Sequence, residues 1–186
     1  MAPSLWRHLF LALVLIFPAP DATSGNTKLI GSAAPEWHLD HWLNSKPLTL
    51  ADLKGKVVLV RWWTAPGCPY CAATAPALNE FHEAYAKEGL AVIGVYHHKS
   101  DALLDAQDVA RRAERFGFSF PVAIDPEWRT LNRWWLDQDD QKWTSVSFLI
   151  DRQGHIRHIH EGGQYVKGEP AYAVMKAKIE ALLRER

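Results

Sequence analysis

The chain has 186 residues, of which 48% are hydrophobic and 23% are charged. This length suits one domain with a full core and is too short for two comfortable ones. The 21 basic and 21 acidic side chains cancel, so no global basic field indicates a nucleic-acid partner and no acidic tail indicates a cationic one.

Residues 1–24 resemble a targeting segment. Arg7 and His8 precede an apolar run at 9–17, and the small residues that follow suit cleavage near Ser24. The run is shorter than the roughly 20 apolar residues that span a membrane. We therefore expect a signal peptide, with an uncleaved N-terminal anchor as the alternative, and export to the periplasm or another oxidising compartment. The remaining domain is expected over 29–186.

The rest of the chain alternates between strand and helix patterns. Short edge strands are expected within 28–40 and 48–53. Apolar runs predict strands at 57–63, 90–96, 120–124, 146–150 and 155–160. Helical periodicity and capping residues predict helices at 71–87, from Ser100 or Asp101 to 116, at 126–135 and at 170–184. This order predicts an α/β fold with a central mixed β-sheet flanked by helices and N-terminal extension strands.

The segment Cys68-Pro69-Tyr70-Cys71 lies between the strand at 57–63 and the helix that follows it. Two thiols at this spacing can form a disulfide and exchange it with a partner. The free N–H groups at a helix start can lower the pKa of a thiol by roughly 1.5 units from its usual value of about 8.5. Cys68 is therefore the expected nucleophile and Cys71 the expected resolving thiol, while Pro69 suits the first helical position.

Three other uses of the cysteine pair stay open. Half of a zinc or copper site needs further Cys or His ligands, and the chain has two cysteines in all, so a metal-binding chaperone would have to recruit a histidine. A structural disulfide would close too small a loop to stabilise the fold much. A thiol peroxidase of the peroxiredoxin type would need Thr-x-x-Cys, but Thr64 lies four residues before Cys68.

Several motifs together match one known family. They are Gly31 with 35–37, the segment 48–60, the cysteine pair, Pro76 five residues after Cys71, and 148–151. On these motifs the chain resembles the TlpA/ResA-like exported group of thioredoxin-fold proteins within the redoxin family, over roughly residues 29–185.

The resemblance implies a thioredoxin-like fold and a redox-active Cys68–Cys71 disulfide. It implies an exported thiol:disulfide oxidoreductase that acts on protein thiols and disulfides and is reduced by an upstream thiol donor. No metal, cofactor or nucleic acid is expected at the site. We expect a monomer, with a transient membrane partner compatible with this function.

The sequence departs from the family pattern near the cysteines. Thr144-Ser145 stands where the family carries a cis-proline facing the pair, and because a non-proline cis bond costs about 3 kcal/mol, we expect a trans or strained loop. Arg61 replaces a buried acid of other thioredoxins and would help stabilise a thiolate if its head reaches the site. The approach loop at 64–67 is one residue longer than usual.

Other side chains are candidates for supporting roles. His97 or His98, just after the strand at 90–96, would shuttle the Cys71 proton, with an ordinary loop histidine as the alternative. Tyr70 is expected to add apolar surface where a substrate docks. Four tryptophans would line a groove near the site or pack in the core, namely Trp128, Trp134, Trp135 and Trp143.

Overall fold

A computed structural model of the chain describes residues 28–138 and 141–185. Six strands form one sheet: β1 (Asp40–Leu43), β2 (Val57–Trp63), β3 (Leu90–Tyr96), β4 (Val122–Ile124), β5 (Ser147–Ile150) and β6 (Ile156–His160). Four helices accompany them: α1 (Pro69–Tyr85), α2 (Ala106–Arg115), α3 (Arg129–Leu131) and α4 (Pro170–Arg184). Shorter helical turns occur at Ala51–Leu53, Ala86–Glu88, Pro126–Trp128 and Asn132–Leu136.

The strand order is β1-β4-β3-β2-β5-β6, and the sheet is mixed. β3 runs parallel to β2 and to β4, whereas β1, β5 and β6 pair antiparallel with their neighbours. All seven residues of β2 are buried, because this strand has a partner on each side and helices on both faces. The predicted central mixed sheet is confirmed.

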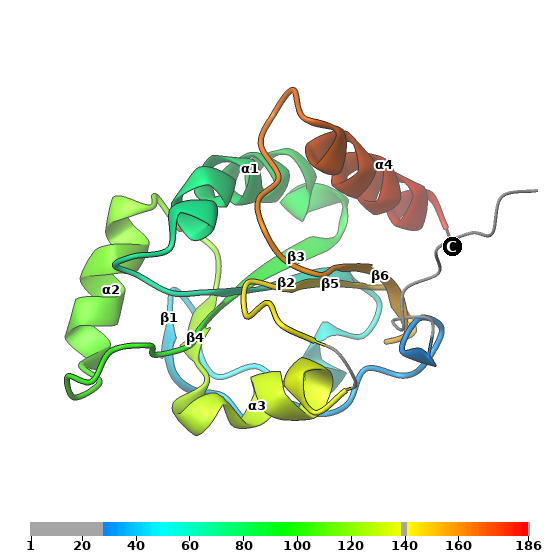
Figure 1. The fold of residues 1–186 in the computed structure, drawn as a ribbon. Coiled ribbons are helices and arrows are strands. Elements are labelled where there is room, and N and C mark those ends of the chain that lie inside the picture. The colour runs from blue at the N-terminus through cyan, green and yellow to red at the C-terminus, as the bar shows by residue number, and fades with distance from the viewer. Residues whose placement is uncertain (1–27, 139–140, 186) are drawn as a thin grey trace, which may run out of the picture.

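The two faces of the sheet support separate cores (Figure 1). α1 and α4 cover one face, and α3 together with the N-terminal segment that precedes β2 covers the other. Alternate residues of β2 enter the two cores: Val57, Leu59 and Trp63 join Cys71 and Phe81 in the first, and Val58, Val60 and Trp62 join Trp134, Trp135 and Phe148 in the second. Arg61 falls between Leu59 and Trp63 in this alternation and therefore faces the α1 side.

The N-terminal extension differs from the prediction. One edge strand forms, β1, and it begins where the expected strand in 28–40 should end. Trp37 is instead a core residue whose indole N–H donates to the carbonyl of Leu48. The segment 48–53 forms a helical turn and no strand, because the Asp52 carboxylate accepts hydrogen bonds from the backbone and hydroxyl of Thr49. Such local bonds compete with strand pairing.

α2 begins later than predicted. Its N-cap is Asp105, whose carboxylate accepts a hydrogen bond from the backbone N–H of Gln107. Ser100 was one expected cap, but its hydroxyl accepts a hydrogen bond from the backbone N–H of Ala102 within a separate bend. The loop between β3 and α2 is therefore longer than the sequence pattern indicated. Gly117, with φ of 72°, ends the helix as expected.

The predicted targeting segment, 1–24, lies outside the described residues. Within 28–138 and 141–185, no helix has both the length and the apolar character needed to cross a membrane. The predicted helix at 170–184 and the strands at 57–63 and 90–96 form with the expected boundaries.

Asp125 joins the carboxyl end of β4 to α3. Its buried carboxylate accepts hydrogen bonds from the indole of Trp62 at 3.1 Å and from the backbone N–H groups of Thr130 at 2.9 Å and Leu131 at 2.7 Å. Burial raises the pKa of this carboxyl, while the three donors act in the opposite direction.

We expect Asp125→Ala to lower the free energy of unfolding by about 3 kcal/mol, because it leaves three buried donors without an acceptor. Asp125→Asn keeps one acceptor oxygen and should cost less. Urea unfolding of the three proteins measures both losses. Equal losses for the two variants would contradict the assignment of the carboxylate as the acceptor that joins these elements.

Candidate active site

The two cysteines lie where β2 gives way to α1. Cys68 is the N-cap of α1, with extended backbone angles, and Pro69 occupies the first turn, where its missing N–H costs nothing. The Sγ of Cys68 accepts a hydrogen bond from the backbone N–H of Cys71 at 3.2 Å. The two residues form a disulfide, with their Cα atoms 5.3 Å apart. The predicted position of the pair at a helix start is therefore confirmed.

The two sulfurs differ in access. Cys71 is 2% exposed and belongs to the core under α1, whereas Cys68 is partly exposed and packs at the edge of that core. The loop that carries Cys68 contains exposed Pro66 and Gly67. An incoming group can therefore reach Cys68 more easily than Cys71.

Tyr70 and Trp143 form an exposed aromatic pair beside the cysteines. Tyr70 is 40% exposed and Trp143 is 49% exposed, and their rings meet edge to face with centroids 5.8 Å apart. Trp143 packs onto Gly162, where an added Cβ would lie 2.3 Å from the Cβ of Trp143, so only glycine permits this approach. The pair places large apolar surface next to the disulfide, and the docking role expected of Tyr70 stays a prediction.

The other three tryptophans do not form a groove with Trp143. Trp134 and Trp135 are 1% and 0% exposed and pack on Phe148 in the core opposite α1. Trp128 is partly buried, and its indole N–H donates to the carbonyl of His98. For Trp134 and Trp135, the core-packing alternative is the one that the structure supports.

Thr144 and Ser145 form the turn that leads into β5. The bond between them is not among the cis peptide bonds of the described residues, where the cis bond is Ala65–Pro66. Ser145 is 5% exposed, and its carbonyl oxygen accepts a hydrogen bond from the guanidinium of Arg61. The absent proline thus leaves a trans turn that a buried cation holds.

Arg61 is 1% exposed and lies on the α1 face of β2. Besides Ser145, its guanidinium donates to the hydroxyl of Ser147 at 3.3 Å and to the carbonyl of Gly163 at 2.7 Å. Its Cζ lies 5.4 Å from the ring centroid of Tyr165. No carboxylate of the described residues lies within ion-pair distance of this cation, and burial lowers its pKa.

A short series of contacts leads from Arg61 to the helix that carries Cys71. The Tyr165 ring under the guanidinium is fully buried, and its backbone N–H donates to the hydroxyl of Thr74 at 3.4 Å. Thr74 lies one turn after Cys71 in α1, and its hydroxyl donates to the carbonyl of Tyr70. These contacts connect the Arg61 head with α1 through Tyr165, and its expected effect on a thiolate stays a prediction.

Pro76 is exposed on the second turn of α1, and the helix continues past it to Tyr85. It lines neither of the two clefts near Cys68 described below. A supporting role of Pro76 at the site, which its match to the family motif implies, therefore stays a prediction. Within the described residues, no three His, Cys, Asp or Glu side chains gather as metal ligands would.

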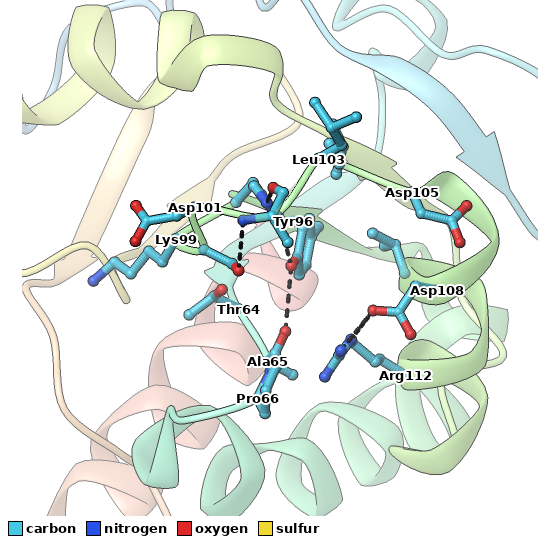
Figure 2. A pocket seen from close by; sticks show the side chains of 15 residues that line it. Thr64, Ala65, Pro66, Tyr96, Lys99, Asp101, Leu103, Asp105, Asp108 and Arg112 are labelled. Atoms are coloured by element: carbon cyan, nitrogen blue, oxygen red, sulfur yellow. Dashed lines mark hydrogen bonds and ion pairs between the residues drawn. The ribbon is translucent and has the colours of Figure 1, made fainter.

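Two adjoining clefts border the cysteine turn, and sequence reasoning did not anticipate them. The first, of about 440 Å³, is mostly apolar and is lined by the turn 65–69, Ala72, Phe116 and two arginines, Arg112 and Arg115. The second, of about 420 Å³, lies between Ala65, Pro66, Arg112 and the loop 98–105 (Figure 2). Arg112 and Arg115 lie one turn apart on α2, but nothing in the sequence pattern shows that α2 lies beside Cys68.

His97 is buried just after β3. Its ring is 0% exposed and meets Trp128 edge to face with centroids 5.3 Å apart, and neither ring nitrogen has a hydrogen-bond partner among the described residues. Burial, with smaller contributions from the charges of Lys99 and Arg61, lowers its pKa to about 3. His97 is therefore neutral near pH 7, which does not suit a proton shuttle there.

The buried His97 is expected to make the stability of the fold sensitive to acid. Because the folded-state pKa of about 3 lies below the usual histidine value of 6.5, the unfolded chain binds the proton first, and stability is lost as the pH falls from 6.5 towards 3. Between pH 7 and 4.5 we expect His97 alone to cost roughly 2.5 kcal/mol of unfolding free energy. His97→Phe should lose that much less in urea unfolding at the two pH values, and an unchanged acid sensitivity would rule the histidine out as its source.

Comparisons with known proteins agree with this geometry. A model of the AhpC/TSA family matches residues 30–159. The thiol-disulfide oxidoreductase ResA of Geobacillus thermodenitrificans is 31% identical over 133 residues, which cover 72% of this chain and 70% of ResA. Protein DipZ of Mycobacterium tuberculosis is 34% identical over 147 residues, 77% of this chain but 19% of DipZ, so the chain spans less than a fifth of that relative.

A solved structure shows the same fold. The crystal structure of a thiol-disulfide isomerase from Corynebacterium glutamicum superposes with a TM-score of 0.64 at 26% identity, covering 82% of this chain and 98% of that one. The predicted resemblance to the redoxin family and the predicted thioredoxin-like fold are confirmed by these matches.

Proposed function

Because the chain belongs to the AhpC/TSA family, we propose that it is a thiol:disulfide oxidoreductase that exchanges disulfides with protein substrates through Cys68 and Cys71. The observation that carries the proposal is the disulfide at the start of α1, with one sulfur accessible and the other buried. The name of ResA, 31% identical over 70% of its own length, states this activity.

The proposed exchange starts from the reduced pair. The Cys68 thiolate attacks one sulfur of a client disulfide, that S–S bond breaks, and the other client sulfur leaves as a thiolate. Cys71 loses its proton and attacks the Sγ of Cys68, which releases the second client thiolate. Two electrons pass to the client, and the Cys68–Cys71 disulfide then needs an upstream thiol donor, which is oxidised in turn.

Two positive fields favour the thiolate. The free N–H groups of the first turn of α1 point towards the N-cap, where Cys68 lies. The buried guanidinium of Arg61 has no carboxylate partner among the described residues to offset its charge, so it acts over a longer range than an exposed cation would. Both fields stabilise the reduced, ionised form of the pair and so make the disulfide more oxidising.

The same proposal includes export. Residues 1–24 carry the charged start, apolar run and small residues of a signal peptide, with cleavage near Ser24 or retention as an anchor. The domain at 29–186 would then act as a monomer in the periplasm or a similar compartment, where protein disulfides persist. A membrane-bound upstream reductant that binds transiently fits this location.

We expect Cys71→Ala to trap substrates on Cys68. With the resolving thiol removed, the mixed disulfide has no intramolecular exit, so reduced Cys71→Ala mixed with insulin should accumulate an adduct on a non-reducing gel that dithiothreitol dissolves. The matched control is Cys68→Ala, whose remaining thiol is buried and should give about ten-fold less adduct. Equal trapping by both variants would contradict the assigned order of attack.

Arg61→Met should raise the pKa of the Cys68 thiol by up to about 1 unit and shift the reduction potential by roughly 20–30 mV to more negative values, because one pKa unit corresponds to about 1.4 kcal/mol. Arg61→Lys keeps the charge and serves as the control, with a smaller shift. The pH profile of thiol alkylation and equilibration with glutathione measure the two quantities. If Arg61→Met and Arg61→Lys shift the thiol pKa and the reduction potential alike, Arg61 acts through its packing and not through its charge.

A further inference from the structure

The apolar cleft beside Cys68 carries an inference that rests on the proposed function and extends it to the choice of substrate. Cys68 itself forms part of the wall of this cleft of about 440 Å³, together with Pro66, Pro69 and Phe116. Its volume falls within the range of about 300–1,000 Å³ that is usual for ligand sites. Whatever chain segment flanks a reacting client cysteine must pass over this surface or over the Tyr70–Trp143 pair.

The charges of the cleft have one sign. Arg112 and Arg115 line it, and no acidic side chain does. Arg112 is neutralised by Asp108, whose carboxylate accepts a hydrogen bond from the Nε of Arg112 at 2.6 Å. Arg115 is exposed at the end of α2 and makes no ion pair or hydrogen bond with the described residues. The N-terminus of α1, at Pro69, adds a second positive field to the same space.

The neighbouring cleft differs in this respect. Figure 2 shows Ala65, Pro66 and Arg112 at its border, with Asp101, Asp105 and Asp108 around it. Lys99 and Arg112 line it as well, and Asp105 and Asp108 pair with Arg111 and Arg112, so the charges of this second cleft are mixed and largely paired. A carboxylate therefore finds an unpaired cation in the first cleft, where Arg115 and Cys68 line the same space.

We propose that the cleft binds a short extended segment of the client polypeptide next to its reacting cysteine, with an apolar side chain against Phe116 and Pro66 and an Asp or Glu carboxylate at Arg115. The protein thus prefers disulfides that lie in acidic, partly apolar sequence over those in basic sequence. Charge complementarity of this kind acts mainly on the rate of encounter.

The test uses three synthetic peptides, each with one cysteine, oxidised to its symmetrical disulfide. They share one sequence with a leucine beside the cysteine, and they differ only in the residue that stands both two positions before and two positions after it, which is Glu, Gln or Lys. Reduced protein is mixed with each peptide, and the rate of protein oxidation is followed by tryptophan fluorescence. In each reaction the protein dithiol becomes a disulfide and one peptide disulfide becomes two thiols.

We expect the Glu peptide to react about ten-fold faster than the Lys peptide at low salt, and about two-fold faster in 0.5 M salt, because screening weakens exposed charges. Arg115→Gln should bring the low-salt ratio down to about two-fold. Arg111→Gln makes the same chemical change on the same helix, but Arg111 lines neither cleft, so the ratio should stay near ten-fold. Since each ratio comes from one protein sample, loss of folded protein cancels.

The outcomes separate the two proposals. If wild-type protein fails to reduce even the Gln peptide, the proposed function is wrong and the substrate preference falls with it. If the Gln peptide is reduced but Glu and Lys peptides react equally fast, the oxidoreductase proposal stands and the docking proposal is overturned. The docking proposal is also overturned if Arg115→Gln keeps the wild-type ratio or if Arg111→Gln lowers it as much.

Discussion

The buried guanidinium of Arg61 is the constraint on which the reactive end of this protein depends. A desolvated cation is costly unless its N–H groups find acceptors, and here the acceptors are Ser145, Ser147 and Gly163. These belong to the turn before β5, to β5 itself and to the loop after β6. The two terminal nitrogens of one side chain of β2 therefore gather three segments on the α1 side of the sheet, while its buried Nε has no partner among the described residues.

That arrangement explains how the site manages without the proline of its relatives. The turn at Thr144 and Ser145 is held from below by a hydrogen bond to its carbonyl oxygen, so no special peptide geometry is needed to place it. The turn also carries Trp143 to the surface, where Gly162 lets it approach closely and meet Tyr70. Aromatic surface thus lies beside the disulfide, at the end of this turn.

Much of the fold could be predicted from the sequence, because its strongest local patterns agree with its tertiary environment. The run at 57–63 is apolar throughout and becomes the central strand, and the periodic segment at 170–184 becomes α4. The wrong predictions are the strand at 48–53 and the start of α2. There the side chains of Asp52 and Asp105 form local hydrogen bonds that decide where a turn or helix begins. Apolar patterns do not carry that information.

The position of the cysteine pair could be predicted from the sequence, and its surroundings could not. The cysteine pair follows the apolar run at 57–63 and precedes a segment of helical periodicity, and these local patterns predict its place at a helix start. The acceptors of Arg61 and the position of Arg115 depend on contacts between segments far apart in sequence, which no local pattern reports. The formal net charge of zero does not reveal this local arrangement. Among the described residues, Asp108 neutralises Arg112 and leaves Arg115 unpaired in the cleft that Cys68 lines. If the cleft docks clients as proposed, their selection follows the charges that remain unpaired beside Cys68, which the total charge of the chain does not report.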